Sequence, residues 1–291
     1  MDWGATLLLA GITWIDGVGR VAPGSLVLRR ALGGAWVATP ADYTDRARWT
    51  VIACWRPLMS GLVLAPAAST RGGDDDARGV RETDARLATH LSRTKPFVLA
   101  LRLLGALALA TLVLGVPWAT GRFGGAGLLA GCGAALLLSA VTAGVAARAL
   151  RALDHGRLAS LGAAVSLLSP FAAPRAADAI LAAAVGDAPQ ELVARRLLEP
   201  HPFEALMRPR AYDALRTPAN PGLPSDDGAR LADLLGTDFL TAVVAAPPAN
   251  CRPEEPFCAR CGAVYRSETV TCFDCGGLEL LSGRDLVSPR R

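Results

Sequence analysis

The sequence predicts a mixed membrane protein in which a transmembrane helical hairpin joins a small β-rich region on its N-terminal side to cytoplasmic helices and a cysteine-containing module on its C-terminal side. Three observations lead to this fold class. The composition is 52% hydrophobic with only 19% charged residues, two central apolar runs are long enough to cross a bilayer, and four of the seven cysteines form two Cys-x2-Cys pairs. A soluble chain of 291 residues rarely has so apolar an average composition.

These features divide the chain into seven segments. They are a short membrane anchor (1–19), a β-rich region (20–68), a loop and basic helix (69–95), the transmembrane hairpin (96–150), a membrane-proximal helical region (151–218), a linker with a short helix (219–250) and the C-terminal module (251–291).

Residues 1–19 are predicted to form a short N-terminal membrane anchor. Positions 3–15 are apolar, and Asp2 stands where a secretory signal would carry basic residues. Arg20 and the arginines that follow would leave the N-terminus outside the cell. Thirteen apolar residues are short for a span, so a helix at the membrane surface or buried in protein is the alternative.

Residues 20–68 carry strand signals. Residues 25–39 predict a hairpin of two strands around Gly33-Gly34, and residues 49–55 and 61–65 predict two further strands. From 69 to 81 the chain is rich in Gly, Asp and Arg and predicts a loop, and a short basic helix is expected over 83–95.

Two apolar runs predict the hairpin. Residues 97–118 contain one charge, Arg102, whose side chain is expected to snorkel toward the headgroups, and the run would extend about 33 Å as a helix. Residues 123–147 contain no charge, and residues 119–122 are expected to form the turn. A pair of buried helices in a soluble core is the alternative.

Small residues recur in the second run at a spacing that brings helices together. Gly127-x3-Gly131 and Ala140-x3-Gly144 would each place two small side chains on one helix face. In a chain with 30 glycines, this pattern also arises from composition alone.

The charges beside the two runs predict their orientation. The segment before the hairpin and the segment after it are rich in Arg and Lys, whereas the predicted turn holds only Arg122. By the positive-inside rule, both flanks are cytoplasmic. We therefore expect a multi-pass protein of the inner (cytoplasmic) membrane with a cytoplasmic C-terminus and with the lipid bilayer as its first partner.

Short helices are predicted after the hairpin. Residues 158–185 suggest two helices at or beneath the membrane surface, and Asp187 is placed to cap a helix that runs to 198. A further helix is expected around 203–207, a linker over 220–228 and a last helix over 231–244.

The C-terminal module contains Cys258-x2-Cys261 and Cys272-x2-Cys275, and a glycine follows each pair. A Cys-x2-Cys-Gly knuckle lets two sulfurs reach one metal ion, so the two knuckles predict a four-thiolate site. Thiolates of this kind suit a reducing compartment, and two disulfides are the alternative.

This spacing resembles that of zinc ribbons and, more distantly, of rubredoxin knuckles, over residues 256–281. The resemblance implies a zinc ribbon whose strands pair residues 264–266 with 278–281. Zn²⁺ is favoured over iron because Phe273 follows Cys272 where rubredoxins carry proline. Residues 251–291 hold six arginines and six acidic residues, so nucleic acid is not favoured as a partner.

No catalytic constellation is evident. The three histidines lie outside any metalloprotease or nucleophile motif, and no glycine-rich phosphate loop follows a predicted strand. The sequence therefore favours a non-enzymatic scaffold that docks a protein partner at its cytoplasmic ribbon. The alternatives are a membrane-attached, rubredoxin-like electron-transfer protein and an enzyme whose site is assembled from scattered residues.

Overall fold

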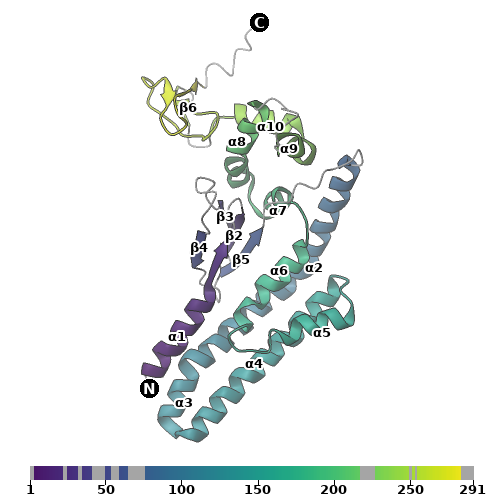
Figure 1. Cartoon of the computed structure of the whole chain (residues 1–291), viewed down its shortest axis with the longest axis vertical. Helices are drawn as coiled ribbons and strands as arrows, with labels where there is room; N and C mark the ends of the chain where they lie inside the picture. The colour runs from purple at the N-terminus through teal and green to yellow at the C-terminus, as the bar shows by residue number, and fades with distance from the viewer. Residues whose placement is uncertain are drawn as a thin grey trace. The chain divides into compact units, whose positions relative to one another are not determined.

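The computed structural model describes residues 3–21, 25–31, 35–40, 50–53, 59–64, 76–216, 227–248, 251–252 and 254–282. The chain divides into two compact units, one formed by Met1–Pro66 and Thr83–Val193 and the other by Ala67–Glu82 and Ala194–Arg291. The described residues are mostly helical, with a small sheet near the N-terminus (Figure 1).

The first unit contains the predicted β-rich region. Strand β2 (Leu26–Ala31) lies between β3 (Trp36–Pro40) and β5 (Met59–Leu64), and both pairings are antiparallel. The central strand is buried at Leu26, Val27 and Leu28, as expected of a strand covered on both faces. The predicted hairpin between β2 and β3 is confirmed, whereas Gly33-Gly34 lie outside the described residues.

A second, two-stranded sheet pairs β1 (Val18–Val21) with β4 (Thr50–Ala53). Strand β4 falls within the predicted run 49–55, but β1 was not predicted. It follows directly on helix α1 (Trp3–Gly17), and a strand of four residues carries too little alternation to stand out. Trp3, Leu7 and Leu8 on α1 are exposed. That α1 anchors the chain in a membrane stays a prediction.

One long helical run covers the end of the predicted loop, the predicted basic helix and the predicted first span. Helix α2 (Asp76–Ala110) continues through a π-helical turn, η1 (Thr111–Gly115), into α3 (Val116–Phe123). The loop expected over 69–81 is therefore wrong for its last six residues. Since Pro117 has no N–H to donate, the wider turn before it lets Val116 N–H bond to Thr111 O without breaking the run.

The turn of the hairpin lies later than predicted. Residues 119–122 are helical, and the chain reverses at Gly124, whose φ is +62° and whose N–H donates to Thr120 O at 2.8 Å. Glycine adopts this conformation without steric cost, which places the break here. Helix α4 (Gly125–Ala152) then returns beside the first helical run (Figure 1).

The two arms of the hairpin pack through glycine. A Cβ at Gly127 would lie 2.0 Å from Ala119 O, and one at Gly131 would lie 3.1 Å from Val116 Cα. The first predicted small-residue pair therefore lies at the helix contact. The second does not, because Ala140 is exposed and a Cβ at Gly144 would meet nothing within 4 Å.

Arg102 does not snorkel, so that prediction is wrong. Its side chain is only 6% exposed, and Nη2 donates to the carbonyl of Arg30 on β2 at 3.2 Å. On the neighbouring strand, Gly61 N–H donates to Asp178 Oδ1 at 3.0 Å. The sheet therefore lies against the helices at this level and gives the guanidinium a protein partner.

The two short helices predicted after the hairpin are confirmed. They are α5 (Arg157–Val165) and α6 (Ala176–Val185), separated by the 3-10 turn η2 (Ala173–Arg175). Both pack on α4 around a core made largely of alanine. Its buried members are Leu101, Ala143, Ala146, Ala147, Ala149, Leu150, Ala164, Leu167, Ala176, Ala177 and Ile180.

Helix α7 (Gln190–Leu197) begins three residues later than the predicted cap at Asp187. In the second unit, α8 (Pro200–Arg216) is longer than expected. The predicted last helix is two helices, α9 (Asp227–Leu235) and α10 (Thr237–Ala245), because Gly236 at φ +88° interrupts it. The Phe203 and Phe239 rings stack at 5.7 Å between centroids and join α8 to α10.

The C-terminal part of the second unit consists of very short strands. Strand β6 (Pro256–Phe257) pairs with β9 (Leu281–Ser282), and β7 (Thr271–Cys272) pairs with β8 (Leu278–Glu279). The predicted pairing of 264–266 with 278–281 is therefore wrong, since Val264 instead bridges Phe257. Each knuckle is built on its own short antiparallel pair. Residues 254–282 are called the cysteine module below.

Candidate metal centre

The first knuckle begins where β6 ends. Cys258 N–H donates to Ala263 O at 2.9 Å, and Gly262 N–H donates back to Cys258 O at 2.9 Å. Gly262 has a φ of +72°, the left-handed conformation that favours glycine. The reversed chain brings Cys261 back beside Cys258.

The second knuckle begins with Cys272 at the end of β7. Gly277 N–H donates to Cys272 O at 2.9 Å, and both Gly276 and Gly277 have positive φ values, of +69° and +87°. The glycine that follows each cysteine pair is therefore required by the backbone, and this turn directs Cys275 toward the first knuckle.

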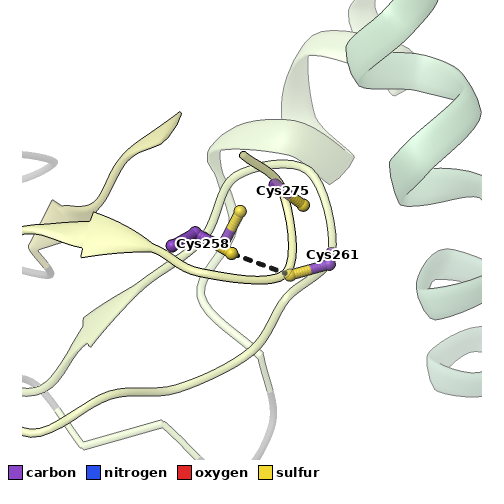
Figure 2. A group of neighbouring side chains, drawn as sticks. Cys258, Cys261 and Cys275 are labelled. Carbon is purple, nitrogen blue, oxygen red and sulfur yellow. Dashed lines mark hydrogen bonds between the residues drawn. The ribbon is translucent and has the colours of Figure 1, made fainter. Parts of the chain in front are cut away.

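The four predicted cysteines come together. The Sγ atoms of Cys258, Cys261, Cys272 and Cys275 all lie within 4.8 Å of one another. Figure 2 shows the Cys258, Cys261 and Cys275 side chains pointing toward one another. The Sγ atoms of Cys261 and Cys272 are 3.6 Å apart, close to the edge of about 3.8 Å expected for a tetrahedron of sulfurs with metal–sulfur bonds of about 2.3 Å.

The same distance excludes a disulfide between Cys261 and Cys272, because a sulfur–sulfur bond is only about 2.05 Å long. All four residues are free cysteines. Cys258 and Cys272 are buried, Cys275 is half-buried and Cys261 is exposed, so the cluster lies at the edge of the module. Its geometry is compatible with a metal site of the zinc-ribbon type.

Burial and hydrogen bonding shift the pKa values of three of the four thiols. Burial raises the pKa of Cys261 and of Cys275. Burial also acts to raise the pKa of Cys272, but hydrogen bonds from Tyr265, Cys258 and Cys261 outweigh it and lower the value to about 7. Four thiolates at these distances repel one another, and a bound cation would remove that repulsion.

Tyr265 is a neighbour of the site that the sequence did not reveal. Its hydroxyl lies 3.2 Å from Cys272 Sγ and donates to Asp274 Oδ2 at 3.3 Å. Its ring meets the Phe273 ring edge to face, with 6.3 Å between centroids. Hydrogen-bond partners of this kind orient metal ligands. The only sequence signal for this role is that one tyrosine lies between the knuckles.

Two arginines also border the cluster and were not predicted. Arg208 lies on α8, and Arg260 lies inside the first knuckle, between Ala259 and Cys261. Since α8 and the cysteine module are far apart in sequence, no local pattern could have indicated that Arg208 reaches the site.

Cys251 is not part of the cluster. Its thiol lies 3.4 Å from the carbonyls of Arg252 and Glu255, and burial raises its pKa. Cys132 lies on α4, and Cys54 falls outside the described residues. Among the residues that the structure describes, the four knuckle cysteines are the one group of His, Cys, Asp and Glu side chains arranged to hold a metal ion.

No protein-family model, curated protein or solved structure matches this chain. The likeness to zinc ribbons therefore rests on the cysteine spacing and on the convergence of the four sulfurs.

Proposed function

We propose that this chain is an integral protein of the inner membrane whose cytoplasmic cysteine module carries a structural zinc ion and docks a protein partner. The observation that carries the proposal is the convergence of the four Sγ atoms within 4.8 Å. Four thiolates around Zn²⁺ complete a tetrahedral shell and leave no position for a substrate, so the metal would stabilise the fold and not take part in catalysis.

The structural role of zinc follows from the size of the cysteine module. Its strands are two residues long, and Phe257 is its one large side chain that is fully buried among the described residues. So small a core cannot offset the entropy of ordering the chain, and metal binding is the usual remedy.

Exposure of the apolar helices supports the membrane assignment. The helical runs Gly79–Phe123 and Gly125–Ala152 are both long and apolar enough to span a bilayer. Core helices of soluble proteins can match them in length and composition, but those helices are mostly buried. Here only 28% and 22% of the two apolar windows are buried. Leucines such as Leu103, Leu107 and Leu129 are exposed, and lipid tails would cover them.

The uneven distribution of positive charge along the hairpin supports a cytoplasmic location for the cysteine module. The end of the hairpin opposite Gly124 carries Arg86, Arg93, Lys95, Arg148, Arg151 and Arg157, whereas the turn end carries Arg122 alone. This is the charge asymmetry of the positive-inside rule. A cytoplasmic location also suits free thiols.

Two exposed side chains support a protein partner. Phe273 is 78% exposed and Val270 is 68% exposed, and both lie in the cysteine module. Protein interfaces are enriched in aromatic residues of this kind. The proposed partner would contact these two side chains.

Metal analysis of the full-length protein purified from membranes tests the proposal. We expect about one zinc ion per chain and no visible absorption band. Iron with a visible spectrum would instead support electron transfer, because four thiolates also bind iron. Purified protein that holds neither metal would contradict both functions.

A further inference from the structure

Arg208 connects α8 to the end of α10. Its side chain is only 5% exposed, and Nη2 donates to Ala246 O at 2.7 Å while Nη1 lies 3.4 Å from Val244 O. These carbonyls belong to the C-terminal end of α10, where backbone acceptors have no partner within the helix. A cation at this end also interacts favourably with the helix dipole.

The same guanidinium faces the cysteine module. Its Cζ lies 5.9 Å from the centre of the Phe257 ring, within the range of a cation–π interaction. A Cβ at Gly262 would lie 3.3 Å from Arg208 Cδ, so the turn of the first knuckle rests on this side chain. Arg208 is therefore packed between α10 and the strand and turn that hold Cys258 and Cys261.

Arg208 is a buried cation close to the four cysteines. Four thiolates with one Zn²⁺ carry a net charge of about −2. A buried cation beside that centre offsets its charge, and the centre in turn stabilises the buried cation.

Arg260 makes a second connection to α8. Its Nε lies 3.0 Å from Asp213 Oδ1, and its Nη2 donates to Asp213 Oδ2 at 3.0 Å, which is the bidentate geometry of an arginine–carboxylate pair. Both arginines thus connect the first knuckle to α8.

From these contacts we infer that Arg208 and Arg260 are positioning residues that couple metal binding in the cysteine module to the order of helices α8 and α10. Neither residue binds the metal. Each of the two arginines connects the cysteine module to a helix. These connections form only when the knuckles are closed around the ion. This inference rests on the proposed metal site and adds that the module and these helices form one metal-dependent body.

Hydrogen exchange of the full-length protein in detergent, with zinc bound and after chelation, tests the coupling. We expect zinc removal to lower the protection of residues 200–216 and 237–246 by about tenfold or more, since the contacts of Arg208 are lost with the metal. Zinc content is measured on the same samples. Unchanged exchange in both helices after complete zinc loss would overturn the coupling and leave the metal site intact.

Two variants and a control test the residues themselves. Arg208→Gln and Arg260→Gln should each lower zinc affinity by about 10- to 100-fold in competition with a chelator. Arg266→Gln makes the same change at an exposed arginine of the module and should stay within about twofold of the wild type.

The Arg260–Asp213 pair is about half exposed, so Arg260→Gln is expected to fold even if Arg208→Gln does not. Asp213→Asn should reproduce the effect of Arg260→Gln, because it breaks the same pair from α8. Wild-type zinc affinity together with wild-type protection of α8 and α10 in Arg260→Gln and Asp213→Asn would overturn the inference. Absence of any bound metal in the wild type would overturn the proposed function along with it.

Discussion

Arg93 on α2 donates a hydrogen bond of 2.9 Å to Oδ2 of Asp154, which lies just past the end of α4. The same guanidinium donates to Ala152 O at 3.3 Å. At this end of the hairpin, Arg93 on the first arm therefore lies beside the end of the second arm. The helical rise from Arg93 to Gly124 is about 46 Å, close to the thickness of a bilayer with its headgroups.

The contact between Arg93 and Asp154 marks the end of the hairpin opposite the turn and leads to a prediction about topology. An impermeant thiol reagent applied to intact cells should label Arg122→Cys at the turn but not Arg93→Cys or Asp154→Cys. Those two variants, like the wild type with its native cysteines, should be labelled only after the membrane is permeabilised. Labelling of the wild-type cysteine module in intact cells would contradict a cytoplasmic C-terminus.

The glycine contact of the hairpin leads to a second prediction. Gly127→Ala should destabilise the protein by about 1–3 kcal/mol, because the new methyl group would lie 2.0 Å from the carbonyl oxygen of Ala119 and the helices would have to move apart. Thermal unfolding in detergent measures the loss.

Gly133→Ala is the matched control on the same helix. A Cβ there meets nothing within 4 Å, and alanine forms helix better than glycine by about 1 kcal/mol, so stability should be unchanged or slightly higher. Equal stability of the two variants would contradict the close packing of α4 on α3.

Replacing Cys258 or Cys251 with serine distinguishes a proposed metal ligand from a cysteine that lies outside the cluster. Cys258→Ser should remove the bound metal and unfold the cysteine module, since a buried ligand of a four-thiolate site is lost. Cys251→Ser should keep about one metal ion per chain, because its thiol lies outside the cluster. Metal content after gel filtration checks both outcomes, and loss of metal from Cys251→Ser would show that the ligand set is wrong.

Tyr265 is predicted to adjust the site without binding the metal. Tyr265→Phe keeps the ring beside Phe273 but removes the hydroxyl 3.2 Å from Cys272 Sγ, so zinc affinity should fall by up to about tenfold. Phe273→Leu keeps the hydroxyl and should bind zinc as the wild type does. Weaker zinc binding by Phe273→Leu than by Tyr265→Phe would contradict this prediction.

Some of this architecture could be predicted because its signals are local. The spacing of Cys258, Cys261, Cys272 and Cys275 predicted the sulfur cluster, since a knuckle is determined by a few consecutive residues. The hairpin of β2 and β3 and the helices α5 and α6 were likewise predictable from alternation, glycines and prolines.

The errors arose where distant segments meet. Arg102 was expected to turn toward the headgroups because nothing in its own segment indicates that β2 lies beside it. Val264 pairs with Phe257 and not with the segment 278–281, because strands of two residues carry no register signal. Arg208 was missed for the same reason, since it joins the site from α8.

X-ray absorption at the metal edge, on the full-length protein purified with its native metal, identifies the metal ion and the atoms bound to it. We expect zinc with four sulfur ligands at about 2.3 Å and no nitrogen or oxygen in the first shell. A first shell containing nitrogen or oxygen ligands, or fewer than four sulfurs per metal ion, would contradict a site made by Cys258, Cys261, Cys272 and Cys275.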